Sequence, residues 1–576
     1  IKMCVEYELD GKKIDYLPAS VEDQLKIKPI YKIFPGWKTP TNGIKDMASL
    51  PENAKKYIYE VEDFIEPSLK KNLPSPLLIK DMAIAVERIS KAFINKEKIA
   101  IFGDYDVDGA TSSAVLYKSF KKFGIEPTIY IPDRQKEGYG PNEKALKSLK
   151  DKGISLVITV DCGITAFNEL DYAKKINLDI IVVDHHVPEA KLPYALALVN
   201  PNRIDDATNL GMLAAVGVSF MLVGALKNKL INIGFIKKEN SINLSSILDL
   251  VALGTVCDVV PLVGPNRAFV KHGLKVMSKR QNTGINALFE ISNVEDFPNV
   301  FHAGFVLGPR INAGGRVGES GLGAKLLTTD DINYAKKISI HLNILNEERK
   351  KLESDVLEES KKMAENYDDN SILVLSGKNW HPGVIGIVAS RIVEQYNKPT
   401  IIIAKNGDNS KGSGRSISGI DIGSIITTAK QSGILENGGG HPMACGLTIN
   451  EDKINDLRLF VNQKNADQNN KIKKTYLVDM AISVSGAIPE LIKQLSLIEP
   501  FGAGNPEPKF IIKDVNLFNA KIVGENHIKC SISDSTNSRL DAIAFRSVGT
   551  ELGKSLLNNY HCLLYTSDAA DDTPCV

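Results

Sequence analysis

Three short stretches decide the fold of this chain: KIAIFGDYDVDG (98–109), LVITVDCG (156–163) and DIIVVDHH (179–186). Each holds a run of mostly apolar, β-branched residues that ends in an aspartate. Runs this short and this apolar are typical of strands buried on both faces of a parallel sheet. Helical patterns at 111–123 and 165–176 lie between them, so strand and helix alternate. The sequence therefore predicts an α/β fold with a doubly wound parallel sheet.

The composition is that of an ordinary globular protein. Of 576 residues, 43% are hydrophobic and 24% are charged, and 70 Lys and Arg against 69 Asp and Glu leave a net charge of +1. A polyanionic partner would therefore have to bind a local basic patch. The seven cysteines form no CxxC pair, which argues against disulfides and zinc ribbons and favours a reducing cytoplasm. The apolar runs are shorter than the ~20 residues of a membrane span.

Shifts in composition divide the chain into six expected parts. These are an irregular N-terminal arm (1–75), the main α/β domain (76–330), a long connecting helix without internal Gly or Pro (331–366), a second, smaller α/β domain (367–465), a small β-barrel of which the OB type is one option (466–560), and an unstructured or non-native tail (561–576).

Acidic and imidazole side chains follow the strands of the predicted sheet. They are Asp104, Asp106 and Asp108 after the first strand, Asp161 after the second, Asp184, His185 and His186 after the third, and Asp258 after an apolar helical run. Ligands of open parallel sheets bind at this carboxyl edge. Unpaired carboxylates would repel one another there, and a pair of divalent cations removes that penalty. Oxygen and imidazole donors suit Mn²⁺ or Mg²⁺, whereas thiolates would favour zinc, so we expect a two-metal site of the kind that cleaves phosphate esters.

Each motif alone allows a simpler interpretation. A DxDxDG run also occurs in turns and Ca²⁺ loops, Asp161 is a common type of helix N-cap, and a His-His pair after a strand often lies on the surface. Their joint position at the ends of parallel strands in one domain favours the metal site.

The same motifs resemble those of the DHH phosphoesterase superfamily. DYDVDG (104–109), VDCG (160–163), VVDHH (182–186) and LGTVCDVVPL (253–262) match its four motifs in order. Further segments resemble the RecJ family of single-strand-specific exonucleases within it: IPDRQKEGYG (131–140), GPRINAGGRVG (308–318), LNILNEERKKLE (342–353), WHPGVIGIVASR (380–391), GSGRS (412–416), GGGHPMACG (438–446) and IEPFGAGNPEP (498–508). The resemblance covers residues 75–560.

This resemblance implies roles for individual residues. The metal ligands would be Asp106, Asp108, Asp161, His185 and Asp258, with Asp161 as the bridge between two ions. The catalytic residues would be Asp104, Asp161, His186, Arg310 and Arg316. The substrate-binding residues would be Arg134, Tyr139, Arg310, Asn312, Arg316, Ser390, Arg391, Ser413, Arg415 and His441.

The residues around these positions add expectations about phosphate and base binding. We expect Arg310 and Arg316 to flank Asn312 in a Gly-rich loop. In GSGRS (412–416), glycines would let main-chain N–H groups face an anion. Tyr139, Trp380 and Phe501 are candidate stacking platforms for bases, although each is equally compatible with a core position.

By the same resemblance, the chain would be a metal-dependent 5′→3′ exonuclease that releases 5′-mononucleotides from single-stranded DNA in repair and recombination. We expect a cytoplasmic monomer without a membrane segment. Helicase and single-strand-binding-protein partners rest on the resemblance alone. The alternative is a DHH phosphodiesterase of short oligonucleotides or cyclic dinucleotides, against which the β unit after 466 argues. A non-enzymatic scaffold is disfavoured because every expected acid and both histidines are present.

Overall fold

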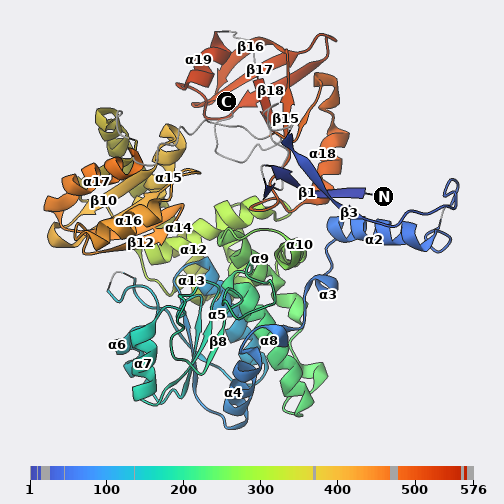
Figure 1. The fold of residues 1–576 in the computed structure, drawn as a ribbon. Helices are drawn as coiled ribbons and strands as arrows, with labels where there is room; N and C mark the ends of the chain where they lie inside the picture. Colours follow the sequence, from blue (N-terminus) through green and yellow to red (C-terminus); the bar gives the residue numbers. More distant parts are fainter. Residues whose placement is uncertain are drawn as a thin grey trace.

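The computed structural model describes residues 2–9, 11–14, 26–44, 46–134, 136–367, 371–466, 478–558 and 563–566. Figure 1 shows a parallel-sheet domain, a second α/β domain beside it, and a C-terminal β lobe, with the long helix α14 (Ile332–Ala364) where they meet. Within these ranges, none of the helices combines the length and the apolar character needed to cross a bilayer.

A five-stranded, all-parallel sheet forms the centre of the main domain, with strand order β5-β4-β6-β7-β8. Its strands are β4 (Ile99–Gly103), β5 (Thr128–Tyr130), β6 (Leu156–Val160), β7 (Asp179–Val183) and β8 (Ala197–Val199). The chain leaves β4 for β5 on one side and then crosses to β6 on the other. This reversal beside β4 is the point at which doubly wound sheets bind ligands, and it confirms the predicted fold class.

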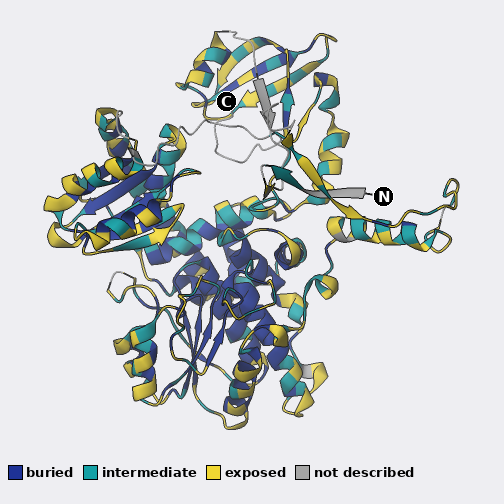
Figure 2. Ribbon diagram, viewed as in Figure 1, coloured by how far each residue is buried: buried dark blue, intermediate teal, exposed yellow. Residues whose placement is uncertain are grey.

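Helices cover both faces of this sheet, because successive strand side chains point to opposite sides. Ile99 and Ile101 pack into the larger core, and Ala100 and Phe102 pack into the smaller one. The larger core contains α4 (Met82–Ile94), α5 (Val107–Lys122), α8 (Ala215–Asn232), α9 (Leu248–Cys257), α10 (Gly264–Met277), α11 (Thr283–Ile291), the π-helix η4 (His302–Leu307), α12 (Gly308–Val317) and α13 (Leu322–Thr328). The smaller core contains α6 (Glu143–Asp151) and α7 (Phe167–Lys175). Figure 2 shows the sheet and the central helices as the most buried part of the molecule.

The second α/β domain has a mixed sheet, with strand order β12-β13-β11-β10-β9. Its strands are β9 (Leu373–Lys378), β10 (Thr400–Lys405), β11 (Ser410–Arg415), β12 (Asn437–His441) and β13 (Ala444–Ile449). Its helices are α15 (Ile385–Tyr396), α16 (Ile422–Gln431) and α17 (Ile454–Ala466). The pair β9 and β10 is parallel, and the other pairs are antiparallel.

The C-terminal lobe contains two three-stranded sheets. They consist of β14 (Met480–Ala481), β15 (Lys509–Ile512) and β19 (Leu563–Thr566), and of β16 (Asn516–Val523), β17 (His527–Ser533) and β18 (Arg539–Ala544), with helices α18 (Pro489–Leu495) and α19 (Glu551–Leu557). The expectation of an unstructured tail from 561 is wrong for Leu563–Thr566, which pairs antiparallel with β15. The stretch LLYT has strand propensity that the polar residues after it obscured. The rest of the expected tail, 561–562 and 567–576, lies outside the described residues.

The N-terminal arm is more regular than expected. It contains a three-stranded antiparallel sheet of β1 (Lys2–Leu9), β2 (Lys12–Ile14) and β3 (Lys28–Ile33), in the order β2-β1-β3, followed by α2 (Glu52–Ile65) and α3 (Leu69–Asn72). Gly11, in the turn between β1 and β2, has φ 79°, a conformation that glycine adopts without strain. The DG pair at 10–11 is the hairpin signal that the sequence offered and that we did not use.

Helix α4 provides a test of the main core. Phe93 is fully buried, and its ring packs edge-on against Phe120 with centroids 5.1 Å apart. We expect Phe93→Ala to lower the free energy of unfolding by ~3–5 kcal/mol because it leaves a cavity. Ile94, the next residue, is 56% exposed, so Ile94→Ala should change it by less than ~0.5 kcal/mol. Urea denaturation measures both, and equal losses would contradict this orientation of α4.

Candidate metal centre and phosphate site

The acidic side chains meet at the carboxyl edge of the parallel sheet. Asp104 follows β4, Asp161 follows β6, and Asp184 follows β7. Asp106 is the N-cap of α5, where its carboxylate accepts the N–H of Gly109 at 3.1 Å. These acids therefore lie together at the carboxyl edge of the sheet, as the sequence predicted.

Two further acids reach the same place from helices. Asp108 lies in the first turn of α5, and its two carboxylate oxygens accept the N–H groups of Ala215 (2.7 Å) and Val216 (2.9 Å) at the start of α8. Asp258 is the C-cap of α9. Helices α5 and α9 thus place Asp108 and Asp258 at the same carboxyl edge.

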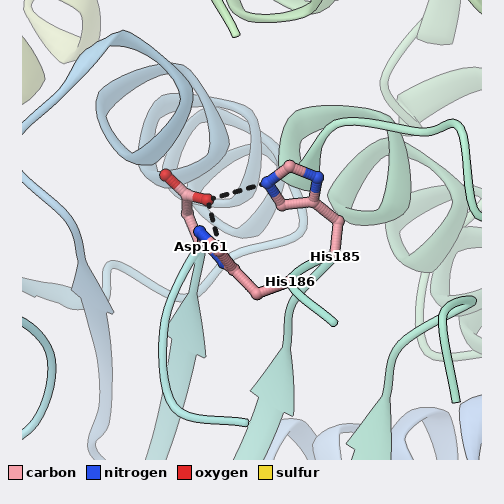
Figure 3. Close-up of side chains that lie close together, drawn as sticks. All are labelled: Asp161, His185 and His186. Atoms are coloured by element: carbon pink, nitrogen blue, oxygen red, sulfur yellow. Dashed lines mark ion pairs between the residues drawn. The ribbon is translucent and has the colours of Figure 1, made fainter. Parts of the chain in front are cut away.

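Three groups of donor atoms form there, and within each group the atoms lie within 4.8 Å of one another. The groups are Asp104, Asp106 and Asp161; Asp108, His185 and Asp258; and Asp161, His185 and His186. His185 Nε2 lies 3.4 Å from Asp161 Oδ1 and 3.5 Å from Asp258 Oδ2. Figure 3 shows the Asp161 carboxylate directed toward both imidazoles. Asp161 and His185 each belong to two groups, as expected of residues placed between two ions.

The backbone at Asp161 is strained. Its φ is 61°, in the left-handed region that residues with a side chain rarely adopt. Its N–H is nevertheless held by the carbonyl of Val183 at 3.0 Å, and Asp161 is buried. Strain of this kind, over-determined by its surroundings, is concentrated at functional sites.

The donor set fits divalent cations. Asp104 Oδ1, His185 Nε2 and Asp258 Oδ2 are buried and have no hydrogen-bond partner among the described residues. Burial and the charge of neighbouring carboxylates raise the pKa values of Asp104, Asp161 and Asp258, so a cation is what keeps them ionised. Burial also raises the pKa of the nearby Cys257 thiol. Oxygen and imidazole donors of this kind suit Mn²⁺ or Mg²⁺.

Asp184, the first residue of the DHH triplet, positions the two histidines. Its Oδ1 accepts the N–H groups of His185 (2.7 Å) and His186 (3.1 Å) and lies 2.7 Å from His186 Nδ1, while Oδ2 accepts the N–H of Ile164. Burial opposes protonation of His186, but the bond to Asp184 raises its pKa to about 9. Burial and the charge of His186 lower the pKa of His185 to about 4. The surroundings thus favour the neutral form of His185, which is the form that binds metal ions, and the protonated form of His186.

Asn200 and Asn202 also support the histidines, and the sequence analysis missed them. Asn200 Nδ2 donates to the carbonyl of His186 at 2.8 Å, and Asn202 Nδ2 donates to that of His185 at 2.5 Å. The sequence could have indicated them, because both residues follow β8 and therefore lie at the carboxyl edge of the sheet, like the acids after the other strands.

Residues 308–317 form helix α12, so the expectation of a Gly-rich loop around Arg310, Asn312 and Arg316 is wrong. The glycines serve close packing: a Cβ on Gly315 would lie 2.0 Å from Cδ2 of Tyr105. Arg316 lies near Asp106 and donates to the carbonyl of Gly383 at 2.9 Å. Arg310 instead donates to the carbonyl of Val306 and to Asn343 of α14. The helix therefore presents Arg316, rather than Arg310, to the metal cluster.

Arg316 is the centre of a cluster of arginines. Arg134, whose guanidinium lies 4.7 Å from the centroid of the Tyr105 ring, is close to Arg316 and to Asp104. Arg415 is close to Arg316 from the second domain. Burial lowers the pKa values of all three, and Arg316 lowers those of the other two further. Clustered guanidinium groups beside a metal site are a typical anion-binding arrangement.

GSGRS does not form an anion nest of backbone amides. It belongs to β11, which pairs with β10 on one side and β13 on the other, so its amides are engaged in the two ladders. The side chains remain available: Arg415 donates to Ser413 Oγ at 3.2 Å, and a Cβ on Gly386 of α15 would lie 3.1 Å from that oxygen. His441 is the exposed last residue of β12.

The other predicted contacts divide into two kinds. Tyr139 lies in the metal centre, where its hydroxyl donates to the carbonyl of Asp161 at 3.0 Å and its ring is half exposed. Trp380 is buried and donates to Glu359 at 2.6 Å, so it is no stacking platform. Ser390 donates to the carbonyl of Gly386 within α15, and Arg391 pairs with Glu353 and Glu394. None of these contacts brings Ser390 or Arg391 to the metal cluster.

Sequence profiles of known families match four parts of the chain. The DHH family N-terminal domain matches residues 98–255, the DHHA1 domain residues 369–467, and the RecJ OB domain residues 478–567. The β lobe is therefore an OB domain, as the fold prediction had it. Residues 1–71 match a different profile, that of adenylosuccinate synthetase. The N-terminal arm thus resembles a different family from the one that the rest of the chain resembles.

Relatives and solved structures extend the same likeness over most of the chain. The single-stranded-DNA-specific exonuclease RecJ of Bacillus subtilis is 35% identical over 82% of this chain and 59% of that protein. The proteins of the same name from Dickeya dadantii (35% identical, 81% and 84% covered) and Escherichia coli (34%, 84% and 86%) are similar along more of their length. A crystal structure of Thermus thermophilus RecJ in complex with Mn²⁺ superposes with a TM-score of 0.70 at 28% identity, covering 84% of this chain and 70% of that one. The Mg²⁺ complex gives 0.66 at 26%, covering 88% and 72%. The chain belongs to the RecJ family of DHH phosphoesterases.

Proposed function

We propose that this protein hydrolyses single-stranded DNA from its 5′ end in a reaction that needs two Mn²⁺ or Mg²⁺ ions and releases 5′-mononucleotides. The observation that carries the proposal is the overlap of three donor groups next to the arginine cluster. The group of Asp161, His185 and His186 shares Asp161 with one of the other two groups and His185 with the other. The RecJ relatives are named single-stranded-DNA-specific exonucleases, and two of the solved RecJ structures are complexes with Mn²⁺ or Mg²⁺.

The residues take the following roles in the proposal. Asp104, Asp106 and Asp161 would hold one ion, and Asp108, His185 and Asp258 the other, with Asp161 between them. When bound, the ions lower the pKa of a water and neutralise charge on the scissile phosphate. His186, whose Nδ1 is held by Asp184, donates a hydrogen bond from its Nε2–H to a non-bridging oxygen. Arg134, Arg316 and Arg415 hold the terminal phosphate by charge-assisted hydrogen bonds.

The other predicted residues contribute to strand binding in this scheme. Tyr139 stacks on the terminal base, and Asn312, one helical turn from Arg316, lies on the same side of α12 with its buried Oδ1 unpaired among the described residues. Arg310, Ser390, Arg391, Ser413 and His441 would contact the strand away from the reacting phosphorus. The OB domain favours long single strands over the alternative substrates, short oligonucleotides and cyclic dinucleotides.

The setting in the cell completes the proposal. We propose a monomer that works in the cytoplasm in DNA repair and recombination. The free, widely spaced cysteines support a reducing compartment. Helicase and single-strand-binding-protein partners follow from the family resemblance.

The shared carboxylate gives the first test of this function. Asp161→Asn removes one ligand charge from both ions, so Mn²⁺-dependent cleavage should fall more than the ~10–100-fold typical of losing a mere supporting contact. Asp151→Asn, at the exposed end of α6, is the matched control and should cleave like the wild type. Release of mononucleotides from 5′-labelled single strands measures activity, and Mn²⁺ binding by electron paramagnetic resonance measures the site. Undiminished cleavage by Asp161→Asn would reject the assignment.

The arginine cluster gives a second test. Arg415→Gln removes a charged donor, so KM for 5′-phosphorylated strands should rise ~10–100-fold, in line with hydrogen bonds to charged groups. Strands with a 5′-hydroxyl lack the phosphate, and their KM should change little. Lys430→Gln, on α16 of the same domain, controls for loss of positive charge. If both substrates lose affinity equally, Arg415 does not hold the terminal phosphate.

A further inference from the structure

A cavity of about 770 Å³ lies between the main domain and the OB domain. The main domain contributes α9, α10 and the π-helix η4, and the other wall is the loop that contains Phe501. Its walls are aromatic and apolar. Phe297 is 61% exposed and Phe305 59%, although large apolar side chains of this kind are usually buried. A concentration of exposed aromatic surface in one cavity marks a binding site.

Two of the aromatic side chains already stack on each other. The rings of Phe301 and Phe305 are stacked, with centroids 5.4 Å apart and planes at 22°. Both lie at the π-helix turn, an irregularity that occurs mostly at functional sites. Aromatic faces of this kind stack on nucleobases without regard to sequence.

The cavity adjoins the metal centre through Cys257. This residue lines the cavity and directly precedes Asp258. The arginine cluster meets the same metal centre through Asp104 and Asp106. A strand whose terminal phosphate lies among the arginines therefore has a second site next to the metals.

The charges around the cavity favour an uncharged occupant. Lys271 and Lys275 line it, but both pair with Glu66, at 3.3 and 3.6 Å. Lys509 is balanced by Glu499 and Glu507, which line the same cavity. Little net charge is left for a phosphate, so the walls suit a base rather than the sugar-phosphate backbone.

We propose that this cavity is a subsite for bases of the single strand beyond the cleaved nucleotide, which stack on the Phe301–Phe305 pair while the scissile phosphate is at the metal centre. The inference deepens the proposed function and rests on it. The subsite would give the enzyme its preference for long strands over dinucleotides, because only a longer strand reaches it.

Phe305→Ala tests the subsite, and Phe305→Tyr is the conservative variant that keeps the aromatic face. KM for a long 5′-phosphorylated strand should rise about tenfold with Ala and return with Tyr. Cleavage of a 5′-phosphorylated dinucleotide should be unchanged. Leu459→Ala, a truncation of a 72% exposed apolar side chain in the second domain, should affect neither substrate. An unchanged KM for the long strand, or an equal loss on the dinucleotide, would overturn the subsite.

A binding measurement separates this inference from the proposed function. Strands with 2-aminopurine at successive positions are added to the Asp161→Asn variant, with and without Phe305→Ala. We expect quenching that depends on Phe305 at one or two adjacent positions near the 5′ end. If quenching depends on Phe305 at none of the positions, the subsite proposal is wrong and the cavity binds another occupant, such as an apolar peptide. If the wild-type protein cleaves neither long strands nor dinucleotides with Mn²⁺, the proposed function is wrong. The quenching measurement does not need cleavage, so it tests the subsite separately.

Discussion

Repulsion among buried carboxylates is the constraint on which this structure depends. Asp104, Asp108, Asp161 and Asp184 are almost fully buried within one edge of a sheet. Hydrogen bonds within the protein compensate part of this repulsion. Asp108 lies at the N-terminus of α8, where two N–H groups and the helix dipole favour its charge. Asp184 is bonded by two backbone amides of the histidines, by the His186 ring and by Ile164. Asp104, Asp161 and Asp258 receive no comparable compensation, and this asymmetry defines where cations belong.

The position of the second domain follows from the same site. Arg316 lies at the end of α12, close to Asp106, and its guanidinium donates to the carbonyl of Gly383. A Cβ on Gly383 would lie 2.4 Å from the carbonyl oxygen of Arg316, so glycine is what allows this approach. Because α14 runs for 33 residues without interruption, it gives the two domains a stiff connection. The contact that joins the domains is therefore built on the same arginine that faces the anion site.

The sequence predicted the strands and the acids well because both signals are local. An apolar run followed by an aspartate indicates a buried strand and also places the aspartate at the carboxyl edge of the sheet. Asp104 and Asp161 are examples. The errors arise where tertiary packing decides. Gly314 and Gly315 favoured a loop, yet they permit α12 to pack against Tyr105 and Leu342. GSGRS favoured an anion nest, but a partner strand on each side engages its amides. For Trp380 the sequence left both a stacking platform and a core position open, and the structure shows it buried with a hydrogen bond to Glu359.

The OB domain contacts the segment that follows Asp258. Val259, directly after Asp258, has φ 58°, a conformation that is unfavourable for a β-branched residue. The chain beyond it is held from the other domain: Leu262 donates its N–H to the carbonyl of Ala503 at 2.6 Å. Arg267 donates to the carbonyls of Ile498 and Glu499 at 2.7 and 3.3 Å. Strain persists only where neighbours over-determine it, so these contacts are what keep Asp258 at the C-terminal end of α9, aimed at His185. Contacts from the OB domain thereby support the segment that follows Asp258.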